Sequence, residues 1–119
     1  MKTLDPSDWA YRPDYIQDDN GDPGASFCVS YHCGPEWVFN FGYYLQAIVQ
    51  VSGKSREEIE ALFDGLLAPH RKMVAMPPWH SLPELTNSDG KLCPPSCVAQ
   101  AWSIGTILEA LYLVDKMKK

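Results

Sequence analysis

Apolar side chains recur with helical spacing in three stretches of the chain, which polar and proline-rich segments separate. The first stretch runs from about Pro35-Glu36 to Val51, and proline is favoured at the first position of a helix. Its apolar residues fall on every face, which is typical of a helix that is buried on all sides. The pattern predicts a buried helix over residues 35–51, ended by Ser52-Gly53.

The second stretch has its apolar positions on one face only. Ser55 followed by Glu58 is a capping box, in which the two side chains satisfy backbone N–H groups at the start of a helix. The apolar positions that follow keep the i, i+3, i+4, i+7 spacing, so this helix should cover a surface. Pro69 should kink or end the helix. The stripe consists of Ile59, Leu62, Phe63, Leu66 and Leu67.

The third stretch runs from about Ser96 to Lys116 and again leaves little polar face. Prolines and glycines break residues 1–34 and 73–95, which we expect to form two long irregular loops. We therefore predict an all-α fold with three main helices. The order buried, covering, buried is expected of an inner and an outer ring of helices. Because two fully apolar helices need more neighbours than one amphipathic helix supplies, we expect a fragment of a larger helical assembly.

Composition and charge argue against several classes of function. The chain has 119 residues, enough for one domain, and its net charge of −5 disfavours nucleic-acid binding, which requires clustered Lys and Arg. It contains no apolar run of about 18 residues, so we expect no membrane span. The N-terminus lacks the apolar core of a secretory signal. The four cysteines could form two disulfides, but without such a signal we expect free thiols in a reducing, cytoplasmic environment.

The stretch from Leu82 to Trp102 carries the candidate chemistry. Glu84 lies between a proline and the polar pair Thr86-Asn87, and the turn Ser88-Asp89-Gly90 follows. Pro94 and Pro95 then stiffen the approach to the last helix. Loops on a rigid scaffold are where catalytic groups concentrate, so Glu84 is a potential acid or base.

Two segments of this stretch, LPELTN and CPPSC, and a third that begins at its end, QAWSIGTILEALY, closely resemble the C-terminal end of the amylo-1,6-glucosidase domain of eukaryotic glycogen debranching enzymes. Upstream, residues 31–37 read YHCGPEW and are similar to that family's YHQGPEW. The resemblance spans nearly the whole chain and implies that residues 1–119 are the C-terminal segment of an incomplete domain. It also implies a fragment of an (α/α)6 barrel, with the active site at the N-terminal ends of the inner helices.

The family resemblance implies hydrolysis of α-1,6-linked glucose stubs in glycogen limit dextrin with inversion. Inverting glycosidases use two carboxyl groups about 6.5–9.5 Å apart. Glu84 matches the position of the family's general base, and the acid should come from a loop far upstream in the family protein. The expected partners are glycogen or another branched α-glucan and the remainder of the enzyme, and no cofactor is needed. The glucanotransferase activity of such enzymes lies elsewhere in the polypeptide.

The same resemblance suggests which residues bind sugar. Aromatic faces stack on pyranose rings, and an imidazole or amide can bond a hydroxyl group. Glu36 is also the second candidate for the base, because the first turn of a helix favours an ionised carboxylate. The chain departs from the family at Cys33, where Gln is usual, and at Phe39-Asn40. The expected substrate-binding residues are Tyr31, His32, Glu36, Trp37, Gln100 and Trp102.

Two alternatives belong to other classes. Cys28-x4-Cys33 and Cys93-x3-Cys97, with His32 between them, resemble a loose zinc pattern, which would make the chain a small zinc-held binding module. The chain could instead be a non-catalytic glucan-binding remnant. The acidic run of residues 18–22 suggests calcium, but its spacing does not fit an EF-hand, and we interpret it as a solvated loop.

Overall fold

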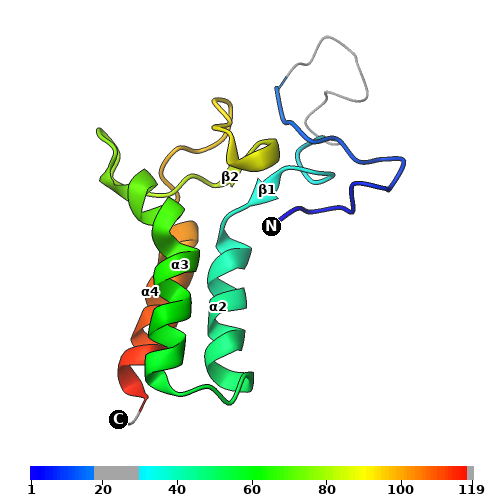
Figure 1. Cartoon of the computed structure of the whole chain (residues 1–119). Coiled ribbons are helices and arrows are strands. Elements are labelled where there is room, and N and C mark those ends of the chain that lie inside the picture. Colours follow the sequence, from blue (N-terminus) through cyan, green and yellow to red (C-terminus); the bar gives the residue numbers. More distant parts are fainter. Residues whose placement is uncertain (18–29, 118–119) are drawn as a thin grey trace. The chain divides into compact units, whose positions relative to one another are not determined.

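The computed structural model describes residues 1–17 and 30–117 of the chain (Figure 1). The chain divides into two compact units, which are described one at a time. One unit combines residues 1–38 with residues 83–98 and contains a pair of short strands. The other combines residues 39–82 with residues 99–119 and contains the helices. Within the described residues, no helix is long and apolar enough to cross a membrane.

Three α-helices form the second unit, as the sequence predicts. They are α2 (Phe39–Val51), α3 (Arg56–Ala75) and α4 (Ala101–Lys116), and they run side by side in Figure 1. The most extensive packing is between α2 and α4. Gly42 of α2 faces Thr106 of α4, where a Cβ atom would lie only 2.2 Å from the threonine Oγ1. The absence of a side chain at Gly42 therefore sets how closely these two helices approach.

Helix α3 begins with the predicted capping box. The Ser55 hydroxyl accepts a hydrogen bond from the backbone N–H of Glu58 at 3.3 Å, and the Glu58 carboxylate accepts one from the N–H of Ser55 at 2.8 Å. The predicted stripe is buried at Ile59, Phe63 and Leu67, whereas Leu62 is exposed.

Pro69 does not end α3, which continues for six residues to Ala75. Of the two expectations for Pro69, a kink or the end of the helix, the second was wrong. The proline removes one backbone donor, but the next residue, His70, stacks on Phe41 of α2 with ring centroids 4.4 Å apart. We attribute the continuation to such contacts between side chains of the last turns and their neighbours.

The predicted start of the first helix was wrong. Glu36 and Trp37 form strand β1 (Glu36–Trp37), which pairs antiparallel with β2 (Leu85–Thr86), and the helix begins only at Phe39. Pairing places Glu36 opposite Thr86 and Trp37 opposite Leu85. These ladder bonds to a segment about 50 positions away compete with a helical start at Pro35, and they add a small sheet to a mostly helical fold.

The predicted start of the last helix was also wrong, because α4 begins at Ala101 rather than Ser96. The Ser96 hydroxyl is buried and donates to the backbone oxygens of Leu85 at 3.3 Å and Cys93 at 3.0 Å. The backbone oxygen of Cys97 accepts from the N–H of Glu84 at 2.8 Å. Residues 96 and 97 thus use their polar groups to hold the β2 segment, and helical hydrogen bonding starts after them.

Neither α2 nor α4 is buried on all sides, so that part of the prediction was wrong for the unit as described. Tyr43 and Tyr44 of α2 are 46% and 47% exposed, and Leu108 and Tyr112 of α4 are 57% and 61% exposed. A unit of three helices has too few neighbours to cover every face of two apolar helices. The faces that do pack include Leu45 and Ala110, whose exposed fractions are zero.

We expect Gly42→Ala to lower the free energy of unfolding by about 1–3 kcal/mol, because the new methyl group would overlap Thr106. Gly65→Ala is the matched control. Gly65 also lies inside a helix, but nothing lies within 4 Å of its added Cβ, so this change should stabilise by about 0.5–1 kcal/mol. Thermal unfolding followed by circular dichroism measures both. Equal melting temperatures for the two variants would contradict the close approach of α2 and α4.

Candidate active site

Glu84 is held by hydrogen bonds on both sides of its own α-carbon. Its backbone N–H donates to the oxygen of Cys97 at 2.8 Å, and its backbone oxygen accepts from the N–H of Val38 at 3.1 Å. The residue lies directly before β2 and is half-buried. The carboxylate therefore projects from a fixed backbone at a point that solvent still reaches.

The Tyr31 hydroxyl hydrogen-bonds with the Glu84 carboxylate. Burial of the tyrosine, followed by this hydrogen bond and the carboxylate's charge, raises the pKa of Tyr31 well above its usual range. The hydroxyl thus stays protonated, and its O–H group donates the hydrogen bond to the carboxylate. The structure brings together two residues that are 53 positions apart and that belong to the two separate motifs of the sequence.

Aromatic rings surround Tyr31. Its ring meets the edges of Tyr15 at 5.1 Å and Trp37 at 4.9 Å between centroids. The Trp37 indole N–H donates to the backbone oxygen of Tyr31 at 3.1 Å. His32 stacks on Trp37 with centroids 5.5 Å apart and an angle of 9°. Trp37 is buried, whereas His32 is exposed, so His32 is the member of this cluster that solvent reaches most easily.

Glu36 lies on β1 rather than in the first turn of a helix, so the argument from the helix dipole was wrong for this residue. Its carboxylate accepts a hydrogen bond from the Thr86 hydroxyl at 3.3 Å. The backbone N–H of Trp37 donates to the backbone oxygen of Met1 at 3.1 Å, so the N-terminal segment also lies against β1. Glu36 is thus a second carboxylate in the same unit as Glu84.

Tyr15, in the N-terminal segment, packs against Tyr31 and lies outside both sequence motifs. It is buried, its backbone N–H donates to the Asn87 side-chain oxygen at 2.9 Å, and its backbone oxygen accepts from the Cys93 thiol at 3.3 Å. Burial raises the pKa of the Cys93 thiol, although hydrogen bonds with Ser96 oppose the shift. Because these partners lie more than 70 positions away, no local pattern could have indicated them.

The glycine of the YHCGPEW motif has a packing role. A Cβ atom on Gly34 would lie 1.8 Å from the backbone oxygen of Arg12, so only glycine fits there. The N–H of Arg12 donates to the oxygen of Cys33 at 2.7 Å, and the N–H of Gly34 donates to the Thr3 hydroxyl at 2.8 Å. The N-terminal segment thus lies directly against this motif.

Gln100 and Trp102 belong to the helical unit. Gln100 is the N-cap residue of α4, and its side-chain oxygen accepts from the Ser103 hydroxyl at 3.0 Å. Trp102 stacks on Phe39 with ring centroids 3.7 Å apart, and its indole N–H donates to the Tyr43 hydroxyl at 3.2 Å. Trp102 is still 49% exposed, so it combines packing on one face with access for a ligand.

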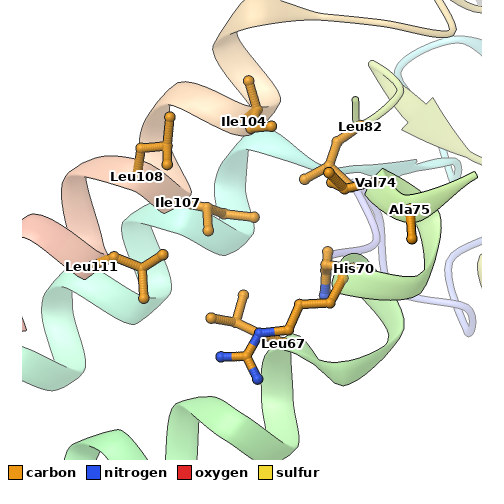
Figure 2. Close-up of a pocket in the computed structure, with 10 residues that line it drawn as sticks. Leu67, His70, Val74, Ala75, Leu82, Ile104, Ile107, Leu108 and Leu111 are labelled. Carbon is orange, nitrogen blue, oxygen red and sulfur yellow. The ribbon is translucent and has the colours of Figure 1, made fainter. Parts of the chain in front are cut away.

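The helical unit also contains an apolar pocket of about 320 Å³ between α3 and α4 (Figure 2). Burial lowers the pKa of His70 in its wall, and the histidine Nδ1 has no hydrogen-bond partner there. No carboxylate lines this pocket, so it lacks the groups for acid–base hydrolysis. The labelled lining residues in Figure 2 are Leu67, His70, Val74, Ala75, Leu82, Ile104, Ile107, Leu108 and Leu111.

The possible metal ligands do not gather within the part of the chain that the structure describes. Over residues 1–17 and 30–117, no group of three or more His, Cys, Asp or Glu side chains is placed to hold a metal ion. Cys33, Cys93 and Cys97 form no disulfide in the part of the chain that the structure describes. Cys28 of the zinc pattern and the acidic run of residues 18–22 lie outside the described residues.

Comparison with known proteins gives this arrangement a family. The family model described as amylo-alpha-1,6-glucosidase matches residues 1–109, and the chain belongs to this glucosidase family. The chain is also 38% identical, over 94% of its length, to the glycogen debranching enzyme of Saccharomyces cerevisiae. It spans only 8% of the length of that curated relative.

We expect the cysteines to react with iodoacetamide at very different rates. Cys97 is exposed, whereas Cys93 is buried, donates to Tyr15 and has a raised pKa, so less of it is thiolate at neutral pH. Raising the pH above neutral should therefore speed the reaction of Cys93, because its thiolate fraction grows. Mass spectrometry of the alkylated peptides distinguishes the two sites. Equal rates in the native protein would contradict the burial of Cys93, and the unfolded protein serves as the control.

Proposed function

We propose that this chain acts as part of a glycogen debranching enzyme and that Glu84 is the general base of its glucosidase reaction. The reaction is hydrolysis of α-1,6-linked glucose stubs in a limit dextrin, with inversion at the anomeric carbon. The single observation that supports this most strongly is the hydrogen bond between Glu84 and Tyr31. It joins, in one place, the two motifs that resemble the debranching family.

The chemistry requires an ionised carboxylate beside a water molecule. The base removes a proton from water as the water attacks the anomeric carbon, and a carboxylic acid on the opposite face protonates the leaving oxygen. Glu84 suits the first task because its backbone is fixed on both sides and because the residue is only half-buried. Water can thus reach a carboxylate that projects from a held backbone.

Glu36 remains the second candidate for the base. Its carboxylate accepts a hydrogen bond from the hydroxyl of Thr86. Thr86 belongs to β2, the strand that directly follows Glu84 and pairs with β1. We favour Glu84 because it lies in the family motif at the position of the base. We assign Glu36 to substrate binding.

The remaining expected sugar-binding residues differ in how much of their surface is available. His32 is exposed and can bond a sugar hydroxyl, whereas Trp37 is buried and supports the ring of His32. Trp102 has an accessible face on the first turn of α4, beside Gln100 at the N-cap. We therefore propose direct sugar contacts for His32, Trp102 and Gln100, and a supporting role for Trp37.

The acid must come from another part of a longer polypeptide. From the family resemblance we expect the acid far upstream in the polypeptide. This chain spans 8% of the length of its yeast relative. We propose that the three helices form part of an (α/α)6 barrel, with α2 and α4 in the inner ring and α3 in the outer ring. The exposed apolar side chains of α2 and α4 support this, because such faces normally pack against further protein.

We expect the purified 119-residue chain to release no glucose from a limit dextrin. Without the acid the leaving oxygen stays unprotonated, so a base alone gives no useful rate. Glucose release measured with a coupled assay tests this, and the full-length enzyme is the positive control. Turnover by the isolated chain would show that it holds both groups.

In the full-length enzyme, Glu84→Gln should lower the kcat for glucose release by about 100- to 10,000-fold, because the amide cannot accept the proton from water. Glu36→Gln is the matched control and should mainly raise KM. The glucanotransferase activity, which the family resemblance places elsewhere, should stay unchanged in both variants and reports correct folding.

Loss of hydrolysis in Glu36→Gln with activity retained in Glu84→Gln would reverse the two assignments. Retention of hydrolysis in both variants would remove the base from this chain. A full-length protein that binds limit dextrin but never hydrolyses it would instead favour the non-catalytic remnant.

A further inference from the structure

We infer that Tyr31 is the positioning residue that fixes the Glu84 carboxylate for its reaction with water, rather than a residue that binds the sugar. The inference rests on the proposed role of Glu84 as base. It gives Tyr31 a different role from the one that aromatic residues in a carbohydrate-binding motif suggest.

Tyr31 is held on several sides, so its hydroxyl has a defined location. Its backbone oxygen accepts from the Trp37 indole at 3.1 Å, and its ring touches the edges of Trp37 and Tyr15. Tyr15 is in turn fixed through Asn87 and Cys93. A ring packed against several others presents its hydroxyl in one direction and offers little free face for stacking on a pyranose.

Glu84 needs such a partner because its backbone alone does not fix its carboxylate. The hydrogen bonds to Cys97 and Val38 hold the α-carbon, but a glutamate side chain still has three rotatable bonds. A hydrogen bond from a held hydroxyl removes most of that freedom before substrate binds. Small misplacements of a reacting group are costly to rate, so this restriction serves the reaction directly.

A tyrosine hydroxyl is suited to this task. It has one hydrogen to donate, so it can engage only one of the two carboxylate oxygens at a time, and the base is oriented without being saturated. The raised pKa of Tyr31 keeps that hydrogen on the hydroxyl at neutral pH and well above it. The contact therefore persists as a donor to an ionised acceptor, which is the stronger kind of hydrogen bond.

The test is Tyr31→Phe in the full-length enzyme, which keeps the ring contacts and removes only the hydroxyl. We expect the kcat for glucose release from limit dextrin to fall about 10- to 100-fold, while KM changes less than about 2-fold. Tyr11→Phe is the matched control: Tyr11 lies in the same unit, with Lys2 over its ring at 5.8 Å, and it should keep wild-type kinetics.

The double variant Tyr31→Phe/Glu84→Gln separates this inference from the proposed function. It should be no slower than Glu84→Gln alone, since the hydroxyl acts only through the carboxylate. A rise in KM with unchanged kcat in Tyr31→Phe would show a sugar-binding role and overturn the inference. Unchanged kinetics in Tyr31→Phe would overturn it as well.

If Glu84→Gln itself retains hydrolysis, it is the proposed function that fails, whatever Tyr31→Phe does. If Tyr31→Phe lowers the melting temperature, the kinetics are measured below its transition, where the kcat-against-KM split and the double variant still decide between the two roles. A double variant slower than Glu84→Gln alone would overturn the inference, because Tyr31 would then act on more than the carboxylate.

Discussion

The antiparallel pairing of β1 with β2 is the interaction on which the candidate site depends. It is only two residues long on each side, yet it joins Glu36 and Trp37 to Thr86 and Leu85 across about 50 positions of sequence. The hydrogen bond from the N–H of Val38 to the oxygen of Glu84 extends the same contact by one residue. Short strands form weak sheets by themselves. Here the pairing is reinforced by the buried side chains of Trp37 and Leu85 and by the Ser96 hydroxyl bound to Leu85.

Local patterns were sufficient where the controlling interactions are local. The capping box of Ser55 and Glu58 set the start of α3 correctly, because both of its hydrogen bonds lie within four residues of sequence. The existence and order of the three helices followed from their periodicity. The starts of α2 and α4 did not, because residues 36, 37, 96 and 97 make hydrogen bonds to segments 11 to 50 positions away instead. Helix propensity is a weak preference that such tertiary contacts override.

In the candidate site, too, the sequence predicted some features and missed others. The two sequence motifs indicated five site residues, and the structure gathers them in one unit: Glu84, Tyr31, His32, Glu36 and Trp37. A motif alone could not distinguish residues that contact a ligand from residues that hold their neighbours in place. Trp37 is a member of the motif and is buried, and Tyr15 supports the cluster from outside both motifs. Gly34 is required by the approach of the Arg12 backbone, a contact with no counterpart in local sequence.

These contacts also explain why the YHCGPEW motif combines so many residue types within seven positions. Gly34 lets the N-terminal segment lie against the motif, and the buried Pro35 leads directly into β1. Trp37 then contributes one hydrogen bond to the backbone of Tyr31 and one ring edge to its side chain. If the segment that carries Tyr31 were free to move, the tyrosine hydroxyl would have no fixed position relative to the carboxylate. The motif is therefore best understood as a rigid frame, in which Gly34, Pro35 and Trp37 define where a single hydroxyl meets Glu84.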